Sequence, residues 1–400
     1  MTYPHFGNSR LIVSLGILTL ALVGRGTAAQ AQTYRVLYQF KAGNDGTQPY
    51  GGVTIDTKRK ALYGTTSEDG SFAAGTVYKL TEHGESVLYS FTGTGGDGEY
   101  PSYPGYLALD ASGNLYGATT AGGNYGIGCG SIGCGVVFKV EQTGEEIILH
   151  EFSGAPDGVN PAGSLAIDAS GSVYGTTYLG GTYGLGTVFK VDSSGNETVL
   201  YSFNPGVGDG YEPFSGLVRD AAGNLYGATL VGGTNGLGTV FEINTSGTET
   251  VIHNFPSNSQ DGAEPWAGLV LDGKGNLYGT TYQGGADNYG TVFKISRAGT
   301  ETVLYSFGPP PDGEGPTYGN NVIVDSAGNL YGMTASGGAY GLGTIYKIDA
   351  NGNETVLHSF SGPDGRAPYS GLAFDPAGNL YGTTSAGGAY GGGVIFRITP

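Results

Sequence analysis

The chain has 400 residues, of which 78 are glycine and 13% are charged, and its 34 acidic residues outnumber 17 basic ones for a net charge of −17. This balance excludes a nucleic-acid-binding function, which needs a basic surface. So much glycine would indicate disorder in an aperiodic chain, but here the glycines recur at fixed intervals, which indicates a repeat protein.

The first predicted element is an export signal in residues 1–31. Arg10 precedes an apolar run from Leu11 to Val23, and small residues follow up to Ala31. Because this run is shorter than the ~20 residues that span a bilayer, we expect a signal peptide cleaved near Ala31, with an uncleaved anchor as the alternative. No other segment is apolar enough to span a membrane. We therefore expect a secreted protein, extracellular or periplasmic.

Residues 32–400 contain seven similar segments with a period near fifty. Their shared "LYG" tyrosines are Tyr63, Tyr116, Tyr174, Tyr226, Tyr278, Tyr331 and Tyr381. One unit, from Asp261 to Phe307, contains four short β-rich runs, "GLVLD", "NLYGTT", "GTVFKI" and "TVLYSF", separated by glycine, aspartate and asparagine. Four strands in each of seven repeats predict a single all-β domain, a seven-bladed β-propeller with four antiparallel strands per blade. A β-solenoid is the competing architecture.

The ends of the chain predict how the ring closes. Residues 34–40 form a fourth-type strand with no preceding three, and the chain stops at "GVIFRITP", a third-type strand with no fourth after it. The N-terminal strand, 35–40, is therefore predicted to pair with 393–398 and complete the last blade.

Both cysteines lie in the second repeat. The loop between its second and third strands is seven residues longer than in the other repeats, and Cys129 and Cys134 lie in this insertion and its flank. In an exported protein two close cysteines predict a disulfide. A redox pair and a metal site are the alternatives, but C-x-x-C spacing and a second ligand pair are both missing. We predict no metal and no cofactor.

The connections between strands fall on two faces of a propeller. What we call the turn face carries the "DxxGN" turns, in which aspartate caps amides and glycine takes a positive φ. The linker face carries the second-to-third loops and the outer-to-inner linkers. All seven linkers contain Asp-Gly-x-x-Pro, from Asp45 to Pro49 in the first and from Asp364 to Pro368 in the last. Sevenfold recurrence favours a structural role for this motif.

What varies between the linkers is the residue after proline, and here we place the candidate binding residues. Several are aromatic, and they are expected at the mouth of the central channel, where aromatics can stack on sugar rings or hold a peptide. The alternative is that they pack against neighbouring loops. The candidate ligand-binding residues are Tyr50, Tyr103, Phe214, Trp266, Tyr318, Tyr369 and the single cation Arg366.

Catalytic residues are unknown from the sequence. Glu212 and Glu264 occupy equivalent positions on adjacent blades, but a glycosidase needs a defined separation of two carboxyls that a sequence does not show. His150, His253 and His358 all lie in outer strands, away from the expected ligand face. A histidine-based acid–base site or a Ser-His-Asp triad therefore lacks its key residue.

The combination of "NLYGTT", "GTVFK" and "VLYSF" resembles the GloVer tandem repeat, found in exported bacterial proteins often called choice-of-anchor proteins. The resemblance covers Tyr34 to Pro400 and implies an exported propeller-like repeat protein with no established chemistry. Members commonly carry a C-terminal anchoring segment, whereas this sequence ends at "ITP" with the last strand. That departure favours free secretion.

Two functions follow as hypotheses. The first is a binding or scaffold module, expected to be monomeric, that recognises a carbohydrate or protein partner at the aromatic mouth. The second is an extracellular polysaccharide-active enzyme, a lyase or hydrolase, which rests on fold analogy alone. A purely structural surface protein is the third hypothesis.

Overall fold

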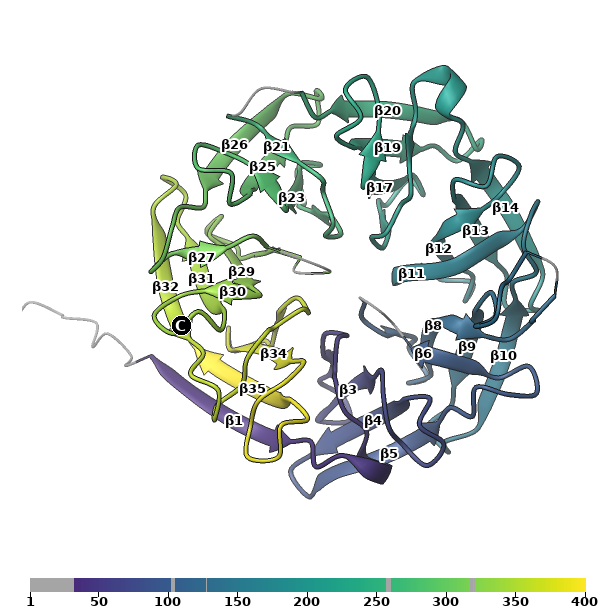
Figure 1. The fold of residues 1–400 in the computed structure, drawn as a ribbon, viewed down its shortest axis with the longest axis horizontal. Helices are drawn as coiled ribbons and strands as arrows, with labels where there is room; N and C mark the ends of the chain where they lie inside the picture. The colour runs from purple at the N-terminus through teal and green to yellow at the C-terminus, as the bar shows by residue number, and fades with distance from the viewer. Residues whose placement is uncertain (1–31, 102–104, 127, 257–259, 317–318, 320) are drawn as a thin grey trace, which may run out of the picture. The chain divides into compact units, whose positions relative to one another are not determined.

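The computed structural model describes residues 32–400 except 102–104, 127, 257–259, 317–318 and 320. Gln32–Pro400 form one compact unit. Seven antiparallel sheets surround a common axis, which confirms the predicted seven-bladed β-propeller (Figure 1). The described residues contain no α-helix, and two short 3-10 turns, η1 (Gly43–Asp45) and η2 (Pro205–Val207), lie in linkers.

The first three blades follow one another along the chain. Blade 1 contains β2 (Thr54–Asp56), β3 (Ala61–Thr66), β4 (Thr76–Thr81) and β5 (Gly84–Ser90). Blade 2 contains β6 (Gly98–Pro101), β7 (Ala108–Leu109), β8 (Leu115–Gly122), β9 (Val136–Val140) and β10 (Glu146–Glu151). Blade 3 contains β11 (Gly158–Ile167), β12 (Val173–Gly180), β13 (Thr187–Val191) and β14 (Glu197–Ser202).

Blades 4 to 6 add a two-stranded ladder, in which the linker pairs with the end of the second strand. Blade 4 contains β15 (Gly210–Tyr211), β16 (Val218–Arg219), β17 (Leu225–Thr229), β18 (Val231–Gly232), β19 (Thr239–Ile243) and β20 (Glu249–Asn254). Blade 5 contains β21 (Gly262–Ala263), β22 (Val270–Leu271), β23 (Leu277–Thr281), β24 (Gln283–Gly284), β25 (Thr291–Ile295) and β26 (Glu301–Ser306). Blade 6 contains β27 (Gly313–Glu314), β28 (Ile323–Val324), β29 (Leu330–Thr334), β30 (Ser336–Gly337), β31 (Thr344–Ile348) and β32 (Glu354–Ser359).

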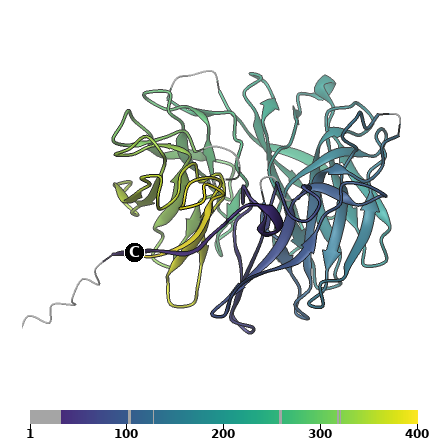
Figure 2. The same cartoon turned by 60° about the horizontal axis from the view of Figure 1, so that its bottom comes forward.

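Blade 7 joins the two ends of the chain, as predicted. It contains β33 (Ala373–Phe374), β34 (Leu380–Thr384), β35 (Val394–Thr399) and β1 (Thr33–Gln39). Strand β1 pairs antiparallel with β35, from Thr33 opposite Thr399 to Gln39 opposite Val394. In Figure 2 the purple strand runs beside the yellow C-terminal strand. The ring is therefore closed by hydrogen bonds between the first and last strands.

The repeated sequence explains how the blades pack. The phenylalanine after each outer strand packs edge-to-face on the aromatic ring of the next blade's third strand, as Phe152 does on Phe189 with 5.1 Å between ring centroids. The glycine of "LYG" makes room for that ring, because a Cβ on Gly175 would lie 2.6 Å from Phe189 Cζ. Apolar clusters between neighbouring blades form the core.

Candidate functional site

The aspartate of each linker acts as a structural brace. Asp97, for example, accepts hydrogen bonds from the amide of Thr92 (2.7 Å), the amide of Gly98 (2.6 Å) and the hydroxyl of Tyr89 (3.0 Å). Tyr89 belongs to the outer strand of the preceding blade, so the aspartate fixes the chain as it leaves that strand. This geometry supports the structural interpretation of the Asp-Gly-x-x-Pro motif.

The residue before each linker proline is a second recurring feature. It takes a left-handed backbone conformation, with φ of 57° at Glu212 and 56° at Glu264. Its amide donates to a carbonyl in the preceding blade's loop, as Glu212 does to Leu185 (3.0 Å) and Glu264 to Leu237 (3.0 Å). The same conformation and bond recur at Gln48, Tyr100, Asn160, Gly315 and Ala367. In blades 4 and 5 this clamp fixes the start of the segment that carries Phe214 and Trp266.

Two of the predicted binding residues are brought together over blades 3 to 5. The rings of Phe214 and Trp266 lie edge-to-face with 5.4 Å between centroids. Tyr178 extends this pair on the Phe214 side at 5.6 Å, and Tyr282 on the Trp266 side at 6.4 Å. These four residues, which we call the aromatic cluster, are half-buried except Tyr282, which is 40% exposed.

Tyr178 and Tyr282 were not among the candidates from the sequence. Both follow "GTT" in their repeats, where the other blades carry serine, threonine, leucine or alanine. That difference between repeats was the available signal, but only the fold brings the end of a second strand beside the next linker.

Two carboxylates lie beside the aromatic cluster. The Glu212 side chain accepts a hydrogen bond from the Tyr178 hydroxyl at 2.9 Å, and that of Glu264 accepts one from Gln283 Nε2 at 3.3 Å. Burial, followed by the bond to Glu212, raises the pKa of Tyr178 to about 12. The tyrosine therefore stays a hydroxyl at neutral pH, and the site combines aromatic faces with hydrogen-bond acceptors.

The remaining predicted residues lie elsewhere. Tyr50 and Tyr369 form a separate pair at the junction of blades 7 and 1, with 5.6 Å between ring centroids. Arg366 is exposed in the linker that leads to Tyr369. Tyr103 and Tyr318 lie outside the described residues. The described candidates therefore form two groups.

Side chains fill the axis that appears open in Figure 1. Tyr106 projects from blade 2 and donates a hydrogen bond from its hydroxyl to the Leu372 carbonyl of blade 7 at 3.0 Å. Its ring lies against Gly52 and Gly371, where a Cβ would come within 2.2 Å and 2.1 Å of the tyrosine. Among the described residues, a cavity of 10 Å³ remains at this level, and one of 220 Å³ lies among the inner strands toward the turn face. The two aromatic groups therefore lie around a filled axis.

A second set of aromatic residues lies at the tips of the second-to-third loops, also on the linker face. These side chains are between 46% and 64% exposed. They are Phe72, Tyr125, Tyr183, Tyr340 and Tyr390. The linker face thus carries an outer set of exposed aromatic side chains in addition to the aromatic cluster.

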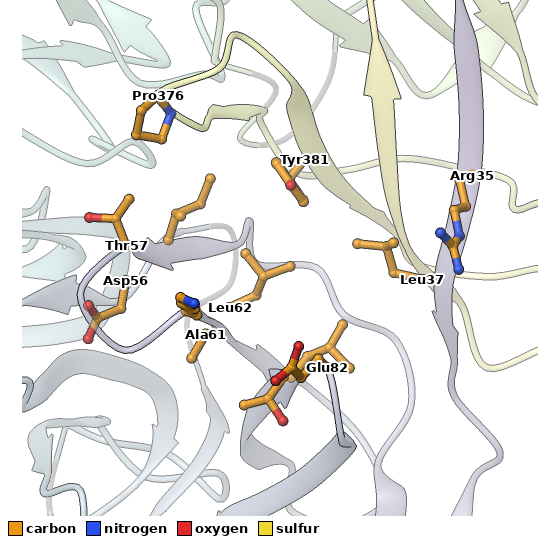
Figure 3. Close-up of a pocket in the computed structure, with 13 residues that line it drawn as sticks. Arg35, Leu37, Asp56, Thr57, Ala61, Leu62, Glu82, Pro376 and Tyr381 are labelled. Carbon is orange, nitrogen blue, oxygen red and sulfur yellow. The ribbon is translucent and has the colours of Figure 1, made fainter.

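The turn face carries a separate cavity of 530 Å³ where blades 7 and 1 meet (Figure 3). Its lining includes the apolar side chains of Leu37 and Leu62 and the charged side chains of Arg35 and Glu82. Arg35 stands where the other outer strands carry serine, threonine or isoleucine.

The predicted disulfide between Cys129 and Cys134 is present. Cys134 is fully buried, and its carbonyl accepts the clamp bond from the amide of Asn160 at 2.9 Å. Cys134 in the loop of blade 2 therefore accepts the same hydrogen bond from the next linker as Leu185 does in the loop of blade 3. The insertion is more closely integrated with the junction of blades 2 and 3 than its placement in a loop suggests.

A closed ring of seven four-stranded blades, each built from one tandem repeat, defines the chain as a β-propeller of the repeat class. The chain belongs to the Gloeobacter/Verrucomicrobia repeat family, whose model matches residues 128–320 and 250–400. The suspected relationship to the GloVer repeat is thereby confirmed.

Two solved structures with TM-scores above 0.5 show the same fold at low sequence identity. The extracellular domains of two B. thetaiotaomicron proteins, described as a hybrid two-component system and a one-component system, are 12% and 17% identical, with TM-scores of 0.57 and 0.54. Each match covers 92% of this chain and 41% or 42% of the other. A gluconolactonase from Xanthomonas campestris is 14% identical, with a TM-score of 0.47, over 89% of this chain and 96% of its own.

No curated protein matches the chain. In the part of the chain that the structure describes, no helix is long and apolar enough to cross a membrane.

Proposed function

We propose that this protein is an exported binding module that recognises a carbohydrate through the aromatic cluster. The observation that carries the proposal is the contact series Tyr178, Phe214, Trp266, Tyr282, which presents half-buried aromatic surface on the linker face. Aromatic rings combine a large apolar surface with polar edges, which suits the mixed apolar and hydroxylated faces of a sugar.

The neighbouring groups suit sugar hydroxyls. The carboxylates of Glu212 and Glu264 accept hydrogen bonds, and each already bonds a polar side chain of an adjacent strand, so their positions are set before a ligand arrives. The outer tyrosines would add contacts for a longer chain. We therefore infer an extended polysaccharide as the ligand.

The charge of the protein narrows the class of polysaccharide. With a net charge of −17, the chain repels anionic polymers at low salt and attracts cationic ones. We therefore propose a neutral or amino-sugar-containing polysaccharide as the ligand. Export, with removal of residues 1–31, is part of this proposal, and the disulfide supports it because such bonds persist in oxidising compartments.

The test is a glycan array followed by titration calorimetry with the wild type and the F214A and W266A variants. Each variant is expected to weaken binding at least tenfold, which corresponds to about 1.4 kcal/mol. Y178F keeps the ring and removes the bond to Glu212, so a smaller loss is expected. E82A changes a side chain on the turn face that is 85% exposed and serves as the control.

Unchanged affinity in both alanine variants would refute the site. The affinities of the Y50A and Y369A variants, measured in the same way, show whether the second aromatic pair belongs to the same site. Release of reducing ends or unsaturated products from the bound polysaccharide would favour the enzyme hypothesis instead.

A further inference from the structure

A recurring polar cluster lies at the outer rim, where neighbouring blades meet. Each cluster has up to three members. The first is the tyrosine or histidine two residues before the phenylalanine that follows an outer strand. The others are the aspartate of the next linker and the glutamate at the start of the next blade's outer strand. Four junctions use Tyr38, Tyr89, Tyr201 and Tyr305. The other three use His150, His253 and His358.

At the tyrosine junctions hydrogen bonds through shared protons hold the cluster together. The tyrosine hydroxyl donates to the aspartate at 2.5 to 3.0 Å. Burial, with the nearby charge of Asp97, raises the pKa of Glu146 to about 8. That carboxyl is therefore largely protonated at neutral pH, which avoids a pair of like charges.

At two histidine junctions the tyrosine hydroxyl is replaced by an imidazole nitrogen, so three metal-ligating groups converge. In His150, Asp157 and Glu197 one atom from each side chain lies within 4.8 Å of the others, and the same holds for His253, Asp261 and Glu301. His150 Nε2 is 3.2 Å from Asp157 Oδ2. His253 Nε2 is 3.9 Å from Asp261 Oδ2 and has no hydrogen-bond partner in the described part of the chain.

These dimensions suit a divalent transition metal. Ligand atoms about 2.1 Å from one zinc ion lie about 3 to 3.5 Å apart in tetrahedral or octahedral geometry, so the side chains need to close by about 1 Å. A histidine with two carboxylates is a ligand set for zinc and its neighbours, whereas calcium and magnesium prefer oxygen alone.

The surroundings of the first site supply the remaining features of a metal site. The Asp157 carboxylate is oriented by the amides of Ser153 (2.9 Å) and Gly158 (2.6 Å). Asp157 and Glu197 also line a surface groove of 520 Å³, which gives an ion and its water access.

We propose that the His150/Asp157/Glu197 and His253/Asp261/Glu301 junctions each bind one divalent ion of the zinc class, with water completing the coordination. This inference departs from the expectation of no metal drawn from the sequence. It is independent of carbohydrate binding, because both sites lie at the rim, away from the aromatic cluster.

The third histidine junction is a built-in negative control. Tyr34 occupies the place of the glutamate there and stacks on His358, with 3.9 Å between ring centroids and planes 2° apart. One carboxylate ligand is missing and one face of the imidazole is covered. This junction is expected to bind no ion.

The test uses the full chain after treatment with a chelator, at pH 7.5. Calorimetry measures the binding of zinc during a titration, and thermal unfolding with and without zinc measures the change in stability. The wild type is expected to bind two ions with micromolar or tighter affinity and to gain thermal stability on binding. H150Y and H253Y should each bind one ion, and the double variant none. H358Y, the matched control, should still bind two.

Tyrosine is the residue that four other junctions use at this position, so the variants are expected to fold. E197Q and E301Q provide a second pair, because glutamine matches glutamate in shape and removes the carboxylate ligand. No zinc binding by the wild type would overturn the proposal, and so would two ions bound by the double variant or by E197Q/E301Q.

Discussion

Tyr106 closes the axis of the ring with a single side chain. The corresponding residues of the other six blades are Gly52, Ser164, Gly216, Gly268, Asn321 and Gly371. Four glycines, one serine and one asparagine leave room at the axis for one large side chain, and the tyrosine both fills this space and donates a hydrogen bond to the carbonyl of Leu372. The innermost strands thereby gain a contact between blades 2 and 7.

This packing predicts two different losses of stability. Y106F removes one hydrogen bond and is expected to lower the free energy of unfolding by about 1 kcal/mol. Y106A removes the ring as well and leaves a cavity, so we expect a loss of about 3 to 5 kcal/mol. Urea denaturation of both variants measures the two effects. An unchanged midpoint for Y106A would show that the axis is not packed as described.

The candidate site was predictable from the sequence only in part. Comparison of the repeats identified Phe214 and Trp266, because both stand at the position after the linker proline, which varies between repeats while the motif before it is constant. Tyr178 and Tyr282 were missed since they belong to a different strand, and their contact with the linkers depends on how the blades lie around the axis. Tyr106 was missed for the same reason, because nothing local to its repeat shows what lies across the ring.

At the scale of elements, the loop between β8 and β9 combines a disulfide with an inter-blade clamp. Replacing Cys134 by leucine restores the residue that blades 3, 4 and 6 carry there, namely Leu185, Leu237 and Leu342. With C129A to remove the partner, the double variant keeps the clamp carbonyl and loses only the covalent bond. Because the closed loop is short, we expect a loss of about 2 kcal/mol in the free energy of unfolding.

Urea denaturation of C129A/C134L against the oxidised wild type measures that loss. Retained β-sheet circular dichroism with a lower midpoint is the expected result. A variant that is unfolded in buffer would contradict it and would show that the disulfide is needed for the fold itself.

Strand pairing was more predictable than the linkers. The isolated fourth-type strand at the N-terminus and the missing fourth strand at the C-terminus together require the pairing of β1 with β35. The ladders β15 with β18, β21 with β24 and β27 with β30 were not predicted, because the linkers have no alternating pattern. The left-handed residue before proline directly follows each ladder, as Glu212 follows β15, and it marks where the linker leaves the second strand.

At the scale of the whole molecule, six inter-blade glutamates make stability depend on pH. Burial and a neighbouring aspartate raise the pKa values of Glu85 and Glu146 to about 8 and those of Glu197, Glu249, Glu301 and Glu354 to about 7. Between about pH 4.5 and 8 the folded chain therefore holds more protons than the unfolded chain, so stability falls as pH rises through this range. Hydrogen bonds lower the pKa values of turn aspartates such as Asp110, against the effect of burial, so their contribution is lost in stronger acid.

Thermal unfolding in the presence of a chelator measures this profile. The highest Tm is expected near pH 5, with a decline toward pH 8. E146Q, which cannot ionise, should reduce the decline relative to the wild type. A Tm that rises from pH 5 to pH 8 would contradict this account of the junctions.

The central claim is that a polysaccharide binds at the aromatic cluster, and the only tryptophan of the chain, Trp266, lies in that cluster. The wild type is titrated with an oligosaccharide selected on the array, and its tryptophan fluorescence is recorded at each step. Because Trp266 is the source of this emission, the measurement reports on the site directly. We predict a saturable change in emission and protection from acrylamide quenching, with the same dissociation constant as calorimetry gives. Calorimetric binding that leaves both the emission and the quenching of Trp266 unchanged would contradict the claim.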